Sequence, residues 1–162
     1  MIKILVVFAI VFLSGCAASG PAFSKVESIP ENSGVVYIFR EKAFVASIVE
    51  IVNYIDGSEV SRLKSNGYSS HIVTSGEHEI VMQWDCAVSG GCTDDAFEHK
   101  VSIPINIEEK QSMYFQLSFI HSIGSDQGAS GQYRLNDTII WSFKEVAESE
   151  ISDKIKRARQ KL

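Results

Sequence analysis

The sequence lacks the local motifs on which many enzyme families depend. The G-x-S-x-G pattern of serine hydrolases and the H-E-x-x-H pattern of zinc proteases do not occur. The phosphate-binding patterns G-x-x-x-x-G-K-[ST] and G-x-G-x-x-G are missing too, and the four histidines have no metal-ligand spacing. We therefore expect no catalytic activity and no bound cofactor or metal.

Positive charge and long apolar runs are also scarce. The chain has 15 Lys and Arg residues against 20 Asp and Glu residues, and a formal net charge of −5. This mildly acidic balance argues against a nucleic-acid partner, because nucleic-acid-binding domains normally have a basic patch. The longest apolar run, Ile4 to Leu13, has ten residues. A helix needs about 20 to cross a bilayer.

That apolar run has the layout of a secretory signal peptide, since it follows Lys3 and ends at small residues. It closes with Leu13-Ser14-Gly15-Cys16, which resembles the lipobox of bacterial lipoproteins. The resemblance implies that residues 1–15 are removed and that Cys16 receives a diacylglycerol on its sulfur and a fatty acyl chain, such as palmitate, on its new amino group. Because two or more acyl chains hold a protein at a membrane essentially permanently, membrane lipid is the first expected partner.

The residue after the cysteine indicates which membrane. In enterobacterial lipoproteins an aspartate at this position retains the protein at the inner membrane, and here the position holds Ala17. The resemblance thus implies a lipid-anchored protein of the bacterial cell envelope, on the periplasmic face of the outer membrane.

Cleavage before Cys16 leaves 147 of the 162 residues, enough for one domain. Loss of Lys3 changes the formal charge to −6. Residues 16–33 contain two prolines and a glycine, which predict the lipidated cysteine followed by a flexible tether. Fully extended, such a tether reaches on the order of 60 Å.

Residues 34–143 alternate β-branched and aromatic runs with turn signals, which is typical of an all-β domain. Val35 to Arg40 is apolar on both faces until Arg40, so we expect a strand covered on both sides. Asp56-Gly57 predicts a hairpin turn. Pro104 cannot donate a ladder hydrogen bond and therefore predicts an edge strand or a bulge. The expected fold is an antiparallel β-sandwich or open barrel. Further strands are expected over Ile48 to Ile55, Ser58 to Leu63, Tyr68 to Thr74, His78 to Asp85, Val101 to Ile107, Met113 to Phe119, and a last run holding Ile139, Trp141 and Phe143.

Residues 144–162 change to a helical period. Ile151, Ile155, Ala158 and Leu162 lie on one stripe, which predicts a short amphipathic C-terminal helix packed on the domain. Its basic residues are candidates for facing a partner, with anionic lipid or the cell wall as sharper alternatives. They include Lys154, Lys156, Arg157 and Arg159.

Two cysteines, Cys86 and Cys92, remain in the mature chain. An even pair outside the cytosol, separated by a Ser-Gly-Gly segment, favours a disulfide that closes a small loop. The alternative is a metal or small-molecule site, or a cryptic active site, in the loop from Asp85 to His99. Zinc-binding cysteines are commonly about two to four residues apart, and that spacing is absent.

Four segments resemble a family of uncharacterised bacterial lipoproteins that share a small β domain of unknown function. They are Val36-Tyr37-Ile38-Phe39-Arg40, Asn53-Tyr54-Ile55-Asp56-Gly57, Ser65-Asn66-Gly67-Tyr68 and Thr74-Ser75-Gly76-Glu77-His78. The resemblance covers residues 34–85 and implies a fold without implying an activity. We expect a non-enzymatic envelope lipoprotein whose β domain binds a periplasmic protein or a wall component; the alternative is the small-molecule or metal module at Asp85 to His99.

Overall fold

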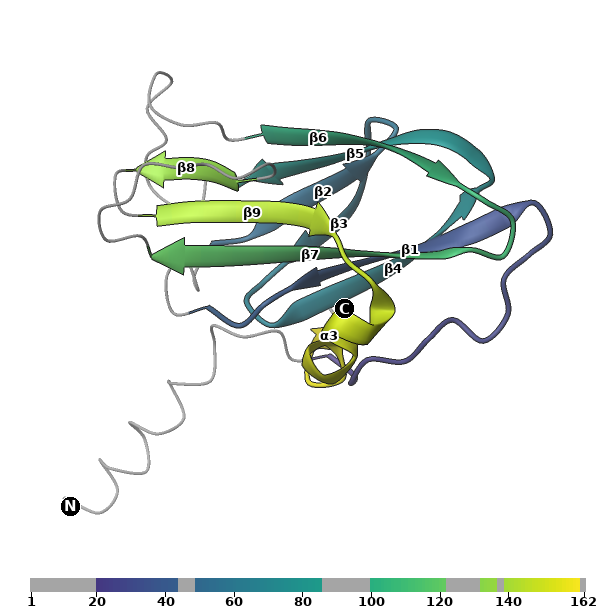
Figure 1. The fold of residues 1–162 in the computed structure, drawn as a ribbon, viewed down its shortest axis with the longest axis horizontal. Coiled ribbons are helices and arrows are strands. Elements are labelled where there is room, and N and C mark those ends of the chain that lie inside the picture. The colour runs from purple at the N-terminus through teal and green to yellow at the C-terminus, as the bar shows by residue number, and fades with distance from the viewer. Residues whose placement is uncertain (1–19, 44–48, 86–99, 122–131, 137–138, 161–162) are drawn as a thin grey trace, which may run out of the picture.

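The computed structural model describes residues 20–43, 49–85, 100–121, 132–136 and 139–160. These residues form two facing β-sheets and one short helix on the outer side of the larger sheet (Figure 1). The elements in chain order are β1 (Ser33–Arg40), β2 (Ile51–Ile55), β3 (Ser58–Leu63), β4 (Gly67–Thr74), β5 (Gly76–Trp84), β6 (Lys100–Ile107), β7 (Ser112–His121), β8 (Gln132–Asn136), β9 (Ile139–Glu145), α3 (Glu148–Ile155) and β10 (Arg159–Gln160).

The larger sheet has the strand order β10-β4-β1-β7-β9-β8, and the smaller has the order β3-β2-β5-β6. The prediction of an all-β sandwich with a short C-terminal helix is confirmed. Two pairs, β1 with β7 and β10 with β4, are parallel, whereas antiparallel pairing was expected. A parallel pair needs a long crossover connection, and β1 reaches β7 only after the chain has built the smaller sheet.

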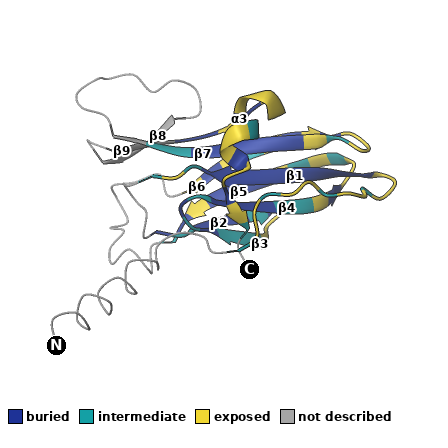
Figure 2. Cartoon of the chain, turned by 90° about the horizontal axis from the view of Figure 1, so that it is seen from below, coloured by how far each residue is buried: buried dark blue, intermediate teal, exposed yellow. Residues whose placement is uncertain are grey.

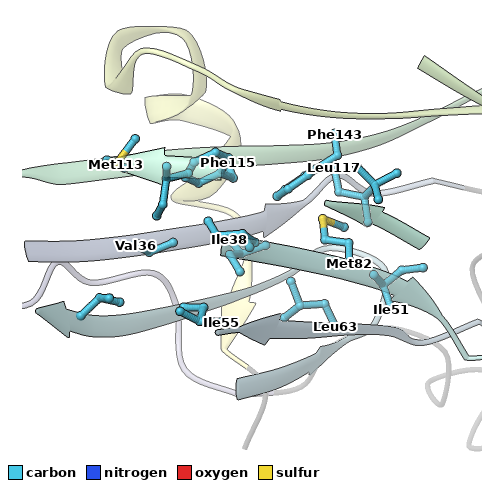
Figure 3. Close-up of a cluster of buried hydrophobic side chains, with 14 of the residues drawn as sticks. Val36, Ile38, Ile51, Ile55, Leu63, Met82, Met113, Phe115, Leu117 and Phe143 are labelled. Atoms are coloured by element: carbon cyan, nitrogen blue, oxygen red, sulfur yellow. The ribbon is translucent and has the colours of Figure 1, made fainter. Parts of the chain in front are cut away.

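The main core lies between the sheets. Figure 3 shows Val36 and Ile38 of β1 in this core, with Phe115 of β7 on one side and Ile55, Leu63 and Met82 of the smaller sheet on the other. Trp84 and Phe115, which belong to two of the predicted strands, are buried in this core.

A second cluster covers the outer face of the larger sheet. Val35, Tyr37 and Phe39 of β1 contribute to it, so β1 is buried on both faces along its length, as expected (Figure 2). Ile151 and Ile155 of α3 pack there through the predicted apolar stripe.

Local turn chemistry also agrees with the sequence. Asp56 and Gly57 join β2 to β3 with φ values of 50° and 76°, the left-handed conformation that a tight two-residue hairpin requires. Pro104 lies in β6, an edge strand of the smaller sheet, where its missing N–H costs no ladder bond.

The C-terminal segment differs from the single helix expected over residues 144–162. Lys144 and Glu145 belong to β9, and α3 ends at Ile155. The chain then turns so that the Arg159 N–H donates to the Asn66 carbonyl at 3.0 Å, and strand pairing replaces helical hydrogen bonds.

Candidate functional site

The segment that follows the predicted lipidation site packs on the domain. Cys16 lies outside the described residues, which begin at Gly20. From there to β1 the chain crosses the outer face of the larger sheet (Figure 1), and Phe23, Val26 and Ile29 are partly buried against the second cluster. This arrangement differs from the free tether expected over residues 16–33, because these three side chains cover aromatic surface that α3 leaves open.

Two tyrosine hydroxyls hold this segment in place. The Val26 N–H donates to the Tyr37 hydroxyl at 2.8 Å, and the Tyr68 hydroxyl donates to the Ala22 carbonyl at 3.2 Å. The Phe23 ring contacts both tyrosines edge to face, with centroids 5.5 Å from Tyr37 and 5.1 Å from Tyr68. Lys25 adds an ion pair to Glu148 of α3.

The two ends of the described chain meet at β10. Ala22 bridges Arg159, and the Gln160 N–H donates to the Pro21 carbonyl at 2.8 Å. At Gly20 even a single added Cβ would lie 1.8 Å from the Gln160 carbonyl oxygen, so the backbones are in close contact. The entry point of the N-terminal segment and the C-terminal strand therefore form one corner of the molecule.

The four basic residues expected to face a partner are on or next to this corner, but their environments differ. Lys154 pairs with Glu41 at 2.6 Å, and Lys156 lies 3.8 Å from Asp153. Arg157 and Arg159 are exposed, and neither forms an ion pair with any residue that the structure describes.

A groove of about 630 Å³ follows the free edge of β4. Beyond Tyr68, no described strand pairs with this side of β4, because β10 covers only Gly67 and Tyr68. Ile72 is the one exposed large apolar side chain among residues whose burial is described, with 52% of its surface accessible. The groove is lined by Val26, Ile55, Asp56, Val60, Ser70, His71, Ile72, Val73, Thr74 and His78.

Two histidines border this groove in opposite protonation environments. Desolvation lowers the pKa of His71, whose Nε2 is buried without a hydrogen-bond partner in the described part of the chain. The hydrogen bond to the Asp56 carboxylate raises the pKa of His78, and the Thr74 carbonyl contributes in the same direction. At neutral pH we expect His71 to be uncharged and His78 to be the more readily protonated of the two.

The His78 arrangement superficially resembles a catalytic triad. Its Nδ1 lies 2.6 Å from Asp56 Oδ2, and its Nε2 lies 3.4 Å from Thr74 Oγ1. Nε2 also lies 2.8 Å from the Thr74 carbonyl oxygen, an acceptor that requires a proton on the nitrogen. A general base needs a free lone pair there. The geometry therefore describes a cross-link between the Asp56 and Thr74 turns, and it offers no activated nucleophile.

Arg40, the last residue of β1, is fully buried between the sheets. Its Nη1 donates to the carbonyl oxygens of Val49 at 2.5 Å and Leu63 at 2.9 Å, and its guanidinium lies 5.0 Å from the centre of the Phe119 ring. Burial lowers the pKa of Arg40 to about 10, with the Glu50 carboxylate partly offsetting it, so the side chain stays charged at neutral pH. These bonds connect β1 to the backbone just before β2 and to the last residue of β3.

The alternative site in the loop from Asp85 to His99 is described only at its first residue. Asp85 pairs with Arg62 at 2.6 Å. Cys86, Cys92 and His99 lie outside the described residues, so the predicted disulfide stays a prediction. No group of three or more potential metal ligands occurs within the described ranges. Among the same residues, no helix has the length and apolar character to cross a membrane.

Sequence reasoning missed the β4 groove and the buried Arg40. Arg40 had a partial signal, because it continues the inward-facing register of Val36 and Ile38. The β4 groove had none, because the polar and apolar residues of β4 do not alternate cleanly between its two faces. No protein-family model, curated protein or solved structure matches this chain.

Proposed function

We propose that this chain is a non-enzymatic bacterial envelope lipoprotein, anchored through acylated Cys16 at the periplasmic face of the outer membrane, that binds a protein partner. The lipobox-like Leu13-Ser14-Gly15-Cys16 and the signal-peptide layout before it support the anchor. The resemblance to lipoproteins with a small β domain points the same way.

The start of the packed chain fits cleavage before Cys16. The first side chain in the second cluster is Phe23, seven positions after Cys16. Loss of residues 1–15 would remove none of the side chains that form the two described cores. The mature protein would keep its whole described fold with an acylated cysteine a few residues away.

The observation that carries the binding function is the unpaired edge of β4 beside exposed Ile72. A free strand edge presents unpaired N–H and C=O groups and is a template for strand addition by an extended peptide. Here the groove adds apolar surface from Val26 and Val60 and a neutral His71 for specificity. A partner segment with alternating apolar side chains fits this surface best.

The anchor is tested by expressing the full chain with Cys16→Ala. The thiolate is the acyl acceptor, so we expect the variant to accumulate as uncut, unacylated precursor while the wild type matures. Mass spectrometry of the intact protein measures both products. Normal maturation of the variant, or a wild-type amino terminus without acyl chains, would overturn the lipoprotein assignment.

The binding surface is tested by crosslinking in intact envelopes. Ile72→Lys places a charge on the free edge, which disfavours strand addition, and removes an apolar contact whose burial is worth about 1.5–3 kcal/mol. We expect recovery of the crosslinked partner to fall by about tenfold or more. Gln83→Lys, an exposed position on the smaller sheet, is the control with the same charge change. Equal recovery with both variants, or binding to purified cell wall in place of protein, would exclude this site.

A further inference from the structure

The corner where β10 meets the N-terminal segment combines positive charge with the exit of the lipid anchor. We define the basic corner as Arg157 and Arg159, which are exposed. Arg159 pairs with Ala22 across an isolated bridge, and its neighbour Gln160 bonds to Pro21. Arg159 is therefore held beside the first described residues of the chain, and Arg157 lies two positions before it.

Covalent geometry limits how far the anchor can lie from this corner. Four peptide units join Cys16 to Gly20. At about 3.3–3.6 Å per residue, the cysteine lies within about 14 Å of Gly20, whatever path the chain takes. An acyl chain on Cys16 would hold the basic corner at or next to the lipid headgroups.

The charges around the corner leave the two arginines available. Lys154 is paired with Glu41, and Lys25 with Glu148. Asp153 lies 3.8 Å from Lys156, and among the described residues it forms no ion pair with Arg157 or Arg159. The Asn66 amide donates to the Arg157 carbonyl at 3.0 Å, so this bond holds the backbone of Arg157 and does not involve its exposed guanidinium group. Arginine suits this position because its planar guanidinium binds phosphate oxygens in a bidentate fashion.

We propose that Arg157 and Arg159 dock on anionic lipid headgroups of the leaflet that holds the acyl chains. This inference rests on the proposed lipid anchor. The anchor raises the local concentration of headgroups, so two arginines suffice to orient the domain although they would not recruit it alone. With the Gly67 end of β4 at the membrane, the Thr74 end can lie up to about 23 Å further away, at about 3.3 Å per residue along the strand, which leaves the β4 groove accessible.

The experiment uses the mature acylated protein in vesicles, with and without about 30% phosphatidylglycerol in phosphatidylcholine. Energy transfer from the tryptophans to a dansyl-labelled headgroup measures the fraction of docked domain. We expect more transfer on anionic vesicles and loss of the difference at high salt, since screening weakens such contacts. Each arginine contributes about fivefold to docking at an anionic surface, so Arg157→Gln with Arg159→Gln should lower the docked-to-undocked ratio by about 25-fold.

Two controls make the result specific. Lys100→Gln with Lys144→Gln removes the same charge from exposed positions on β6 and β9, and β9 lies four strands from β10, about 19 Å across the sheet. Arg157→Lys with Arg159→Lys keeps the charge and should keep most of the docking. The docking inference alone is overturned if energy transfer is the same with and without anionic lipid, or if it falls as much in the Lys100→Gln, Lys144→Gln variant as in the arginine variant. An unacylated Cys16 in the same sample, seen by mass spectrometry, overturns the anchor and the docking together.

Discussion

Phe23→Ala should release the N-terminal segment from the sheet without unfolding the sandwich. Phe23 is partly buried, so its apolar contact is worth about 0.8–1.5 kcal/mol, half of the value for a fully buried phenylalanine. Its two edge-to-face contacts with Tyr37 and Tyr68 add about 0.5–1.5 kcal/mol each. The expected loss is therefore about 2–4.5 kcal/mol, confined to residues 20–32 because the main core does not include Phe23.

Amide hydrogen exchange measures this loss directly. The Val26 amide donates to the Tyr37 hydroxyl, so its exchange reports opening of the segment. At about 1.4 kcal/mol per factor of ten, Phe23→Ala should speed its exchange by thirtyfold or more, while amides of β1 and β7 keep their rates. Phe23→Leu keeps apolar area and loses the ring contacts, so its Val26 exchange rate should lie between those of the wild type and Phe23→Ala. A Val26 amide that exchanges freely in the wild type, or one that is indifferent to Phe23→Ala, would refute the docked segment.

Three further predictions concern the stability of the sandwich. The Asp56 contact raises the pKa of His78, so its stabilisation is complete below about pH 6.5 and is lost as pH rises through the raised value. In urea unfolding, the difference in unfolding free energy between the wild type and His78→Gln should become smaller toward about pH 9. A difference that increased with pH would contradict the pairing of His78 with Asp56. Phe115→Ala should cost about 3–5 kcal/mol because Phe115 is fully buried, and an unchanged melting curve would exclude its central position. Gly34→Ala places a Cβ 2.5 Å from Ile107 Cδ1 and 2.8 Å from the Gln111 carbonyl, so it should cost about 1–3 kcal/mol in the same assay, with partial recovery by Ile107→Val.

The features that the sequence predicts well are those that depend on local chemistry. The Asp56-Gly57 turn follows from the left-handed conformation of both residues, and the edge position of Pro104 follows from its missing N–H. The double-sided burial of β1 follows from an uninterrupted apolar run. None of these requires knowledge of which strands are neighbours in space.

What the sequence does not predict depends on partners that are distant along the chain. The parallel pairing of β1 with β7 is not encoded in either strand, and β8 has too few apolar residues for a clear period. In the sequence, Arg40 ends the apolar run of β1, which predicts a polar residue at the exposed end of the strand. Its burial is tolerated because the carbonyl groups of Val49, before β2, and of Leu63, at the end of β3, accept its hydrogen bonds next to the Phe119 ring. The β4 groove is missed for the same reason, since only the sheet order leaves that edge open.

The N-terminal segment shows how a local rule and a global requirement can disagree. Gly20, Pro21 and Pro30 predict a linker. However, Tyr37 lies on the outer face of β1, and it would be exposed to water if no other segment packed over it. Two buried isoleucines of an eight-residue helix are too few to provide it. Phe23, Val26 and Ile29 recur every third residue and complete the cover. Because this spacing ties the start of the domain to its surface, the proposed acyl anchor on Cys16 would keep the sandwich close to the membrane, and the proposed docking would place the basic corner next to lipid and the Thr74 end of the β4 groove further from it.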